Sequence, residues 1–362
     1  MAQKITHWLL ITLILSLGFG QLLRFEFSGV PLYLHDILIL VILCLLIPRS
    51  VLKRNSWLQA KKGSTAVERT DLMGTIGIKI FLIGLSLGFL RALTLYPLIS
   101  LLTPILYSLR LLAYLALFFQ LKSAKIRISH SYFLISGVIT LFIGLLQYFL
   151  LPDMRWAQYL GWDDHLSRLT MPHFDPTFTA VMLGLALLST TKVFPKFWLL
   201  TSIFYSAGIL LSYSRSVWLS LILTGLLFIK NQKILLVSGV LLLLFISVLP
   251  QKFGEGTNLL RTFSIESRFN NDLSIIRDLN WDLITGIGMH RGPNNSYLYL
   301  LLASGILGLV GWGMFMFSLY QKSFYKSMLI FFFLASLFNN VMFYPFALLW
   351  VLLIESTAPT AT

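Results

Sequence analysis

Charge and cysteine are both scarce in this chain. Only 12% of its 362 residues are charged, about half the fraction usual in soluble domains. A single cysteine, Cys44, stands inside an apolar run, where we interpret it as a small hydrophobic residue. One cysteine excludes a disulfide within the chain and a cysteine-based metal centre. The shortage of charge excludes an ordinary soluble domain.

Apolar runs take the place of the missing charge. Hydrophobic residues make up 57% of the chain, and the mean hydropathy is +0.81. Runs of about 20 residues, long enough to cross a bilayer core, recur from end to end. The first run lacks a small-residue cleavage site, and a second follows at residue 33, so we interpret the first as a retained helix. The predicted spans are 7–23, 33–47, 72–90, 98–120, 131–151, 174–191, 197–213, 216–229, 234–250, 296–320, 327–341 and 343–354.

The predicted fold class is an all-α polytopic membrane protein, with about 12 transmembrane helices in a single domain over residues 1–362. Three connections are long: 48–71 on the cytoplasmic side, 152–173 on the outer side, and 251–295, the largest outer loop, between spans 9 and 10. Apolar residues at helical spacing over 261–283 predict an amphipathic helix that rests on the membrane or caps the bundle. A solvated loop containing one helix is the alternative.

Basic residues, which give the chain a net charge of +14, are distributed unevenly. With both termini in the cytoplasm, sixteen lie on inward connections and ten on the outer side, whereas eleven of the 14 acidic residues lie outside. Short loops rich in lysine and arginine stay in the cytoplasm, so this asymmetry predicts a multi-pass protein of the bacterial inner membrane in that orientation. The basic excess attracts anionic membrane lipid, and no nucleic-acid partner is expected.

Two polar stretches interrupt the apolar pattern near the middle of the chain. Ser214 and Arg215 form a tight outer hairpin, where a guanidinium group suits bidentate binding of phosphate. The alternative is an arginine that merely ends a helix. The second stretch holds Arg168, His173 and Asp175 among prolines, so its irregular backbone favours the lining of a cavity. Asp175 either shares a proton with His173 or caps the following helix.

A third polar stretch, 286–298, contains His290, Asn294 and Asn295 after two glycines that permit tight turns. A histidine here is either a general base near neutral pH or simply solvated. Arg110 lies in the middle of a span and must face other helices or water. It is either a tether for a tyrosine or carbonyl, or a ligand for the phosphate end of a lipid. No spacing of His, Cys or carboxylate residues predicts a metal site.

The order of these motifs resembles the O-antigen ligase and polymerase family of bacterial cell-surface polysaccharide enzymes. The resemblance extends from about residue 100 onward, over a polar stretch with Arg168-Leu169 and Asp175-Pro176-Thr177, Ser-Arg-Ser at 214–216, and a large outer loop ending in Asn294-Asn295-Ser296-Tyr297-Leu298. It implies a glycosyltransferase bundle of the GT-C type, working without a metal ion or other cofactor.

The same resemblance implies that a glycan passes from a polyprenyl diphosphate carrier at the outer leaflet to a sugar hydroxyl on a glycan or lipid-linked acceptor. Arg215, Arg168 and Arg268 are expected to hold the diphosphate, and Arg110 is a further candidate. The family motif places histidine where this chain has Asn294. Either His290 substitutes as base, with His173 as the rival candidate, or Asn294 orients the acceptor, or the reaction differs. A secondary transporter or lipid-glycan flippase, and a non-catalytic assembly subunit, are the other functional classes.

Overall fold

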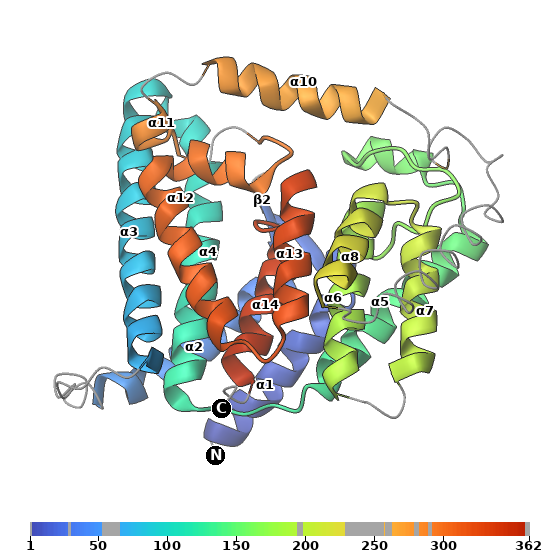
Figure 1. Cartoon of the computed structure of the whole chain (residues 1–362), viewed down its shortest axis with the longest axis horizontal. Helices are drawn as coiled ribbons and strands as arrows, with labels where there is room; N and C mark the ends of the chain where they lie inside the picture. Colours follow the sequence, from blue (N-terminus) through green and yellow to red (C-terminus); the bar gives the residue numbers. More distant parts are fainter. Residues whose placement is uncertain are drawn as a thin grey trace.

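The computed structural model describes residues 2–27, 30–52, 66–193, 198–228, 257, 263–278, 282–288 and 292–358. These form an all-α, membrane-embedded bundle (Figure 1). Four helices contain apolar stretches long enough to cross a bilayer: α3 (Ala66–Leu95), α4 (Leu98–Ala124), α5 (Ser131–Leu150) and α12 (Ser296–Lys322). The shorter apolar helices are α1 (Ala2–Leu17), α2 (Leu34–Leu52), α6 (Pro176–Val193), α7 (Trp198–Leu211), α8 (Arg215–Phe228), α13 (Lys326–Phe338) and α14 (Pro345–Thr357).

Each predicted span corresponds to one of these helices, except 234–250, which lies outside the described residues. The shorter helices have apolar stretches of 10–17 residues, below the 20 or so that a full crossing takes. Helix formation therefore follows the apolar runs closely, whereas the helix lengths alone support four crossings.

Several short elements connect the bundle. The 3-10 helix η1 (Gly20–Leu23) leads into an antiparallel hairpin of β1 (Arg24–Phe27) and β2 (Val30–Tyr33), in which Arg24 pairs with Tyr33. The segment 152–173 contains a 3-10 helix, η3 (Arg155–Leu160). In the large loop, α10 (Phe263–Asp278) is the helix that the apolar spacing predicts, and α11 (Asp282–Thr285) follows it. Figure 1 shows α10 lying across the end of the bundle opposite the two chain termini.

The hydrophobic core is densest around α14, whose residues are almost all buried, including Trp350 and Phe346. A helix that is apolar all round belongs inside a bundle, because it has no face suited to water. Helices α4, α6 and α1 surround it. Since α14 starts at the end of the bundle near α10 and runs back toward the termini, its buried position fixes the connection 339–344 at the end where the candidate site lies.

Helices α3 and α12 pack along much of their length through small residues. A Cβ atom added to Gly84 would lie 2.5 Å from the amide nitrogen of Gly308, and one added to Gly77 would lie 2.6 Å from the carbonyl oxygen of Gly311. Such distances leave no room for any side chain. The two backbones are therefore in direct contact along a glycine seam, formed by these four residues, of the kind that joins helices in membranes.

Candidate functional site

The end of the molecule opposite the termini brings together most of the predicted site residues. Helix α7 ends there, helices α8, α12 and α14 begin there, and α10 lies across them (Figure 1). Helix ends carry backbone groups without partners inside the helix, so polar side chains collect around them. This convergence explains why residues more than 100 positions apart share one site.

Arg168 supports the turn between α7 and α8. Its Nε donates a hydrogen bond to the carbonyl oxygen of Ser212 at 2.9 Å, and its Nη2 donates to that of Tyr213 at 3.5 Å. The side chain is only 7% exposed. Arg168 thus positions the turn from which Arg215 starts α8, and its contact with a diphosphate stays a prediction.

Arg215 and Arg268 form the arginine pair of the site. Arg215 is the first residue of α8 and Arg268 lies on α10, yet the two are close enough for their charges to act on each other. The Nη1 of Arg268 donates to the Oδ1 of Asn339 at 2.5 Å and to the carbonyl oxygen of Phe338 at 3.4 Å. Like charges repel, and an anion bound between two guanidinium groups relieves that repulsion.

Asn339 links the two arginine-bearing helices. While its Oδ1 accepts from Arg268, its Nδ2 donates to the hydroxyl of Ser216 on α8 at 2.9 Å. The side chain of Ser216 lies 3.4 Å from that of Ser214, which donates to Thr177 at 3.3 Å. The pattern of sequence motifs did not assign Asn339 to the site. The only signal was a polar pair, Asn339-Asn340, at the junction of two apolar helices.

The two asparagines of the third polar stretch are anchored next to this cluster. Asn295 caps α12, because its Oδ1 accepts from the backbone N–H groups of Tyr297 and Leu298 at 2.8 and 3.1 Å. Its Nδ2 donates to the carbonyl oxygen of Leu337 at 2.8 Å. The backbone N–H of Asn294 donates to Asp272 of α10 at 3.0 Å, so α10 is joined to the start of α12.

Two other predicted residues have structural contacts. The Oδ1 of Asp175 accepts from the N–H groups of Thr177 and Phe178 at 2.6 and 2.9 Å, so Asp175 caps α6, which was one of its two interpretations. The hydroxyl of Tyr297 donates to the carbonyl oxygen of Phe333 on α13 at 3.0 Å. A catalytic role for either side chain stays a prediction.

Of the two histidines predicted as candidate bases, His290 lies outside the described residues. His173 is fully buried, with its Nδ1 2.7 Å from the hydroxyl of Tyr344. Burial lowers the pKa of His173 to about 3. An imidazole with that pKa is neutral at pH 7 but is a weak acceptor of protons, so His173 is poorly suited to act as a general base.

Arg110 has a carboxylate partner that the sequence did not reveal. Its Nη2 lies 2.8 Å from the Oδ2 of Asp36, its Nε donates to the Oδ1 of Asp36 at 3.0 Å, and its Nη2 also donates to the carbonyl oxygen of Pro31 at 2.5 Å. The hydroxyl of Tyr114 donates to Asp36 at 3.1 Å. The side chains of Arg110 and Asp36 are only 9% and 12% exposed. The bond to the Pro31 carbonyl agrees with the interpretation of Arg110 as a structural tether.

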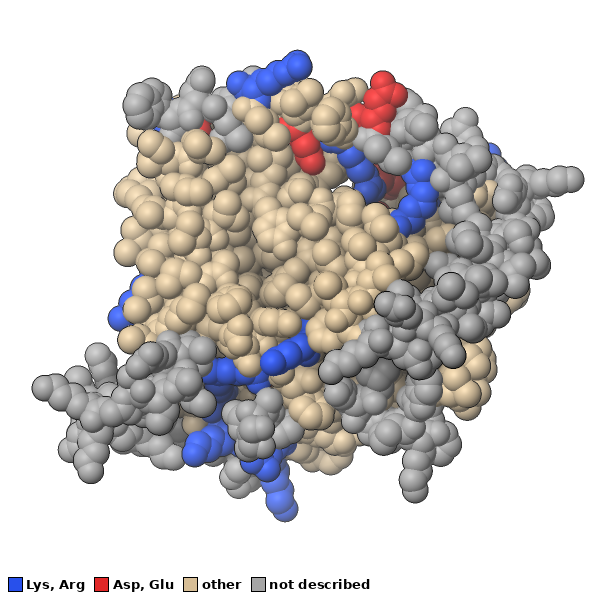
Figure 2. All heavy atoms as spheres, in the orientation of Figure 1, with Lys and Arg blue, Asp and Glu red and all other residues tan. Residues whose placement is uncertain are grey.

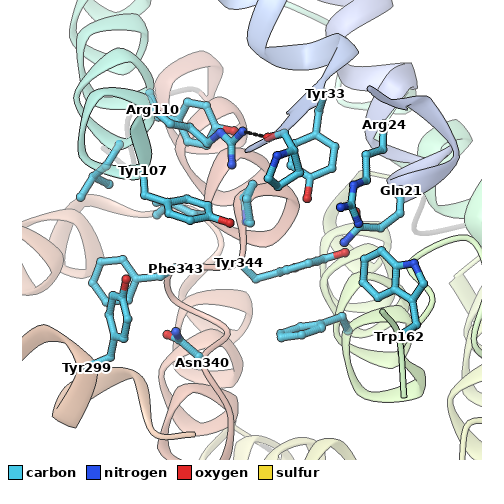
Figure 3. A pocket seen from close by; sticks show the side chains of 16 residues that line it. Gln21, Arg24, Tyr33, Tyr107, Arg110, Trp162, Tyr299, Asn340, Phe343 and Tyr344 are labelled. Atoms are coloured by element: carbon cyan, nitrogen blue, oxygen red, sulfur yellow. Dashed lines mark hydrogen bonds between the residues drawn. The ribbon is translucent and has the colours of Figure 1, made fainter. Parts of the chain in front are cut away.

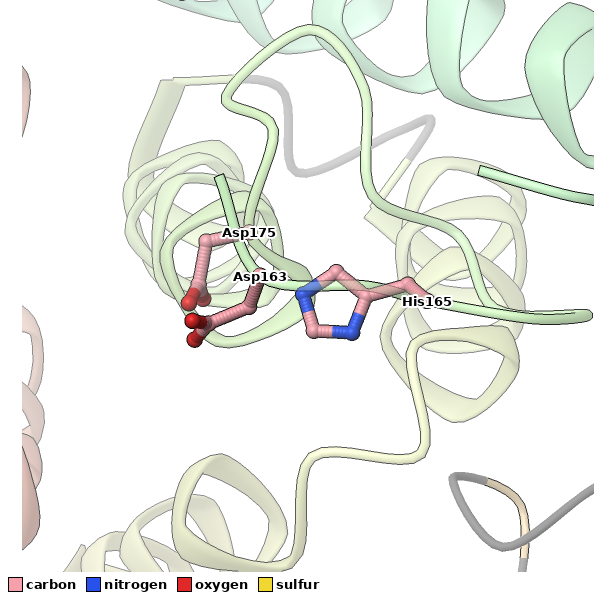
Figure 4. Close-up of side chains that lie close together, drawn as sticks. All are labelled: Asp163, His165 and Asp175. Atoms are coloured by element: carbon pink, nitrogen blue, oxygen red, sulfur yellow. The ribbon is translucent and has the colours of Figure 1, made fainter. Parts of the chain in front are cut away.

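One group of side chains has the composition of a metal site. Asp163, His165 and Asp175 each place one ligand atom within 4.8 Å of the others (Figure 4). Carboxylate and imidazole are ligands that divalent metals accept. Burial and the nearby charge of Arg168 lower the pKa of His165, and the same positive charge opposes a bound cation. Asp175 is also engaged in capping α6, so we assign no chemical step to this group.

Comparisons with known protein families, with characterised proteins and with solved structures give no match to this chain.

Proposed function

We propose that this protein transfers a glycan from a polyprenyl diphosphate carrier to a sugar hydroxyl at the outer leaflet. The observation that carries the proposal is the arginine pair, in which Asn339 binds Arg268 of α10 and also Ser216, the residue next to Arg215 on α8. A departing diphosphate needs positive charge that is already in place, and planar guanidinium groups bind two phosphate oxygens at once.

In this reaction the acceptor hydroxyl attacks the anomeric carbon of the donor glycan. The bond between that carbon and the diphosphate oxygen breaks, and the arginine pair binds the departing polyprenyl diphosphate. The hydroxyl proton passes to a base. We assign this base to His290, because the other candidate, His173, is buried and hydrogen-bonded to Tyr344. Asn294, beside α10, orients the acceptor.

The direct test is a transfer assay in proteoliposomes that contain a polyprenyl-diphosphate-linked glycan and a glycan acceptor. The wild-type protein is expected to release polyprenyl diphosphate only when the acceptor is present. His290→Ala is expected to slow transfer by about 10²- to 10⁴-fold, the usual cost of losing a general base. His173→Ala serves as the matched control and should turn over at a rate near wild type. Loss of transfer in His173→Ala alone would move the base to the other loop.

The orientation in the membrane is part of the same proposal: about 12 crossings, with both termini in the cytoplasm and α10 outside. Both termini lie at one end (Figure 1), and in Figure 2 lysine and arginine appear at both ends of the face shown, whereas the acidic residues visible there lie only at the end opposite the termini. At the end with the termini, Lys122 and Lys322 lie in the last turns of α4 and α12, and Lys326 is the first residue of α13. Positive charge of this kind stays in the cytoplasm.

A reporter fused at residue 270, on α10, is therefore expected to be active only outside the cytoplasm, and one at residue 60 only inside. Paired fusions that give opposite signals at the two sites are needed, since a single silent fusion has other causes. If both signals are reversed, the orientation is wrong, and the arginine pair would face the cytoplasm.

Transport of a lipid-linked glycan is the second candidate, and the Arg110–Asp36 ion pair favours it. Transporters place ionisable pairs inside the bundle along the substrate path. The discriminating measurement is the same proteoliposome with donor confined to one leaflet. Movement of donor between leaflets without release of polyprenyl diphosphate would favour transport, whereas acceptor-dependent release favours glycan transfer.

A further inference from the structure

A second polar site lies next to the arginine pair. It is a cavity of about 480 Å³ between the β1–β2 hairpin, α4, the start of α12 and the connection 339–344 (Figure 3), which we call the outer cavity. Its volume is in the range of cavities that hold small molecules. Aromatic side chains face the space from several elements, among them Trp162, Tyr107, Tyr299 and Tyr344.

Three residues that line the outer cavity each have one buried side-chain atom without a hydrogen-bond partner among the described residues. These atoms are the Oε1 of Gln21, the Nη1 of Arg110 and the Oδ1 of Asn340. The side chain of Arg110 is 9% exposed and Gln21 is 7% exposed. Buried polar groups without partners are rare in native proteins, and a bound molecule is one explanation. Three such atoms around a single cavity point to a common ligand.

The chemistry of these atoms defines that ligand. Two amide oxygens accept hydrogen bonds and require hydroxyl or N–H donors, while the guanidinium nitrogen donates and requires an oxygen. Aromatic faces offer an apolar surface to the same molecule. A sugar ring meets all three demands, because it has hydroxyl groups around its edge and C–H groups on its faces. A lipid acyl chain would leave all three polar atoms unsatisfied.

We propose that the outer cavity binds one sugar residue of a glycan, which accepts a hydrogen bond from Arg110 and donates hydroxyl hydrogen bonds to Gln21 and Asn340. Neighbouring residues place this sugar beside the arginine pair, since Asn339 binds Arg268 and Asn340 lines the cavity. Among the described residues the lining includes Arg24 and Arg110 and no carboxylate, so an acidic sugar is admitted as well as a neutral one. That this sugar belongs to a substrate of the transfer reaction rests on the proposed function; its binding does not.

The test uses the full-length protein in lipid nanodiscs and measures binding of three probes by saturation-transfer NMR: methyl glucoside, methyl N-acetylglucosaminide and methyl glucuronide. At least one probe is expected to bind saturably to the wild type. Gln21→Met and Asn340→Leu, which replace the amides by apolar groups of similar size, are each expected to weaken binding about tenfold, the loss of roughly one hydrogen bond to a buried partner. Thermal unfolding of each variant checks that it is folded.

Arg215→Lys is the matched control, because Arg215 does not line the outer cavity. It should bind the probes as the wild type does even where it fails in glycan transfer. Absence of saturable binding to the wild type, or wild-type affinity in both cavity variants, overturns the sugar site. If the protein transfers glycan but does not bind the probes, the proposed function stands and the sugar site is wrong. If it binds the probes but does not transfer glycan, the sugar site stands and the proposed function is wrong.

Discussion

Replacement of Arg215 by lysine is expected to slow glycan transfer by about 10²-fold, the effect of removing one preorganised donor from a developing negative charge. Lysine keeps the charge but loses the planar fork that binds two phosphate oxygens together. The lysine ammonium also places its positive charge differently relative to Arg268, whose side chain is held by Asn339. The measurement is acceptor-dependent release of polyprenyl diphosphate from proteoliposomes.

Arg155→Lys is the matched control for this experiment. Arg155 belongs to the connection 152–173, is exposed, and forms an ion pair with Asp153 at 2.6 Å. Because that pair lies in solvent, its exchange for a lysine pair should leave the transfer rate unchanged. Transfer by Arg215→Lys at the wild-type rate would remove Arg215 from the diphosphate site, and a loss of similar size in both variants would indicate a general effect of surface charge.

Replacement of Asp36 by leucine is expected to lower the free energy of unfolding by about 3–5 kcal/mol, because Arg110 then stays buried without its carboxylate. The hydroxyl of Tyr114 loses one of its two hydrogen-bond partners in the same variant and keeps the Nε2 of His35 at 2.8 Å. Thermal unfolding in nanodiscs measures the effect. The double variant Asp36→Leu/Arg110→Leu should recover most of the lost stability, since an apolar pair of similar volume carries no uncompensated charge.

Asp153→Leu supplies the comparison with an exposed pair and should change unfolding little, because Arg155 remains solvated. If Asp36→Leu unfolds at the wild-type temperature, the buried ion pair between α2 and α4 does not contribute to stability. If the double variant is as unstable as the single one, the loss comes from the packing around Tyr114 and not from an unpaired charge.

The apolar runs of the sequence predicted the helices well, because each run is long, and helix is the structure that satisfies its own backbone in lipid. The hairpin β1–β2 was missed, since Arg24–Tyr33 is a short stretch between two apolar runs and gives no strong alternating pattern. The helix in the large outer loop was predicted from its apolar spacing and is α10.

The candidate site was predicted in part. Arg215 and Arg268 were grouped through the resemblance to the ligase and polymerase family, and in the structure Asn339 links Arg268 to Ser216, the neighbour of Arg215. The Arg110–Asp36 ion pair could not be predicted from the sequence, because the two residues are 74 positions apart and neither local segment indicates the other. A binding role for Asn340 and Gln21 could not be predicted, because the cavity that they line is formed by tertiary packing.

The glycine seam between α3 and α12 has a consequence for biosynthesis. The 200 residues 96–295 separate the two helices in the chain, and a ribosome adds about 5–20 residues per second, so α3 waits about 10–40 s for its partner. During that interval its glycine face, including Gly77 and Gly84, is turned to lipid. Helix α3 must therefore remain stable in the bilayer before α12 reaches it, and a larger residue at Gly308 or Gly311 is expected to keep the two helices apart.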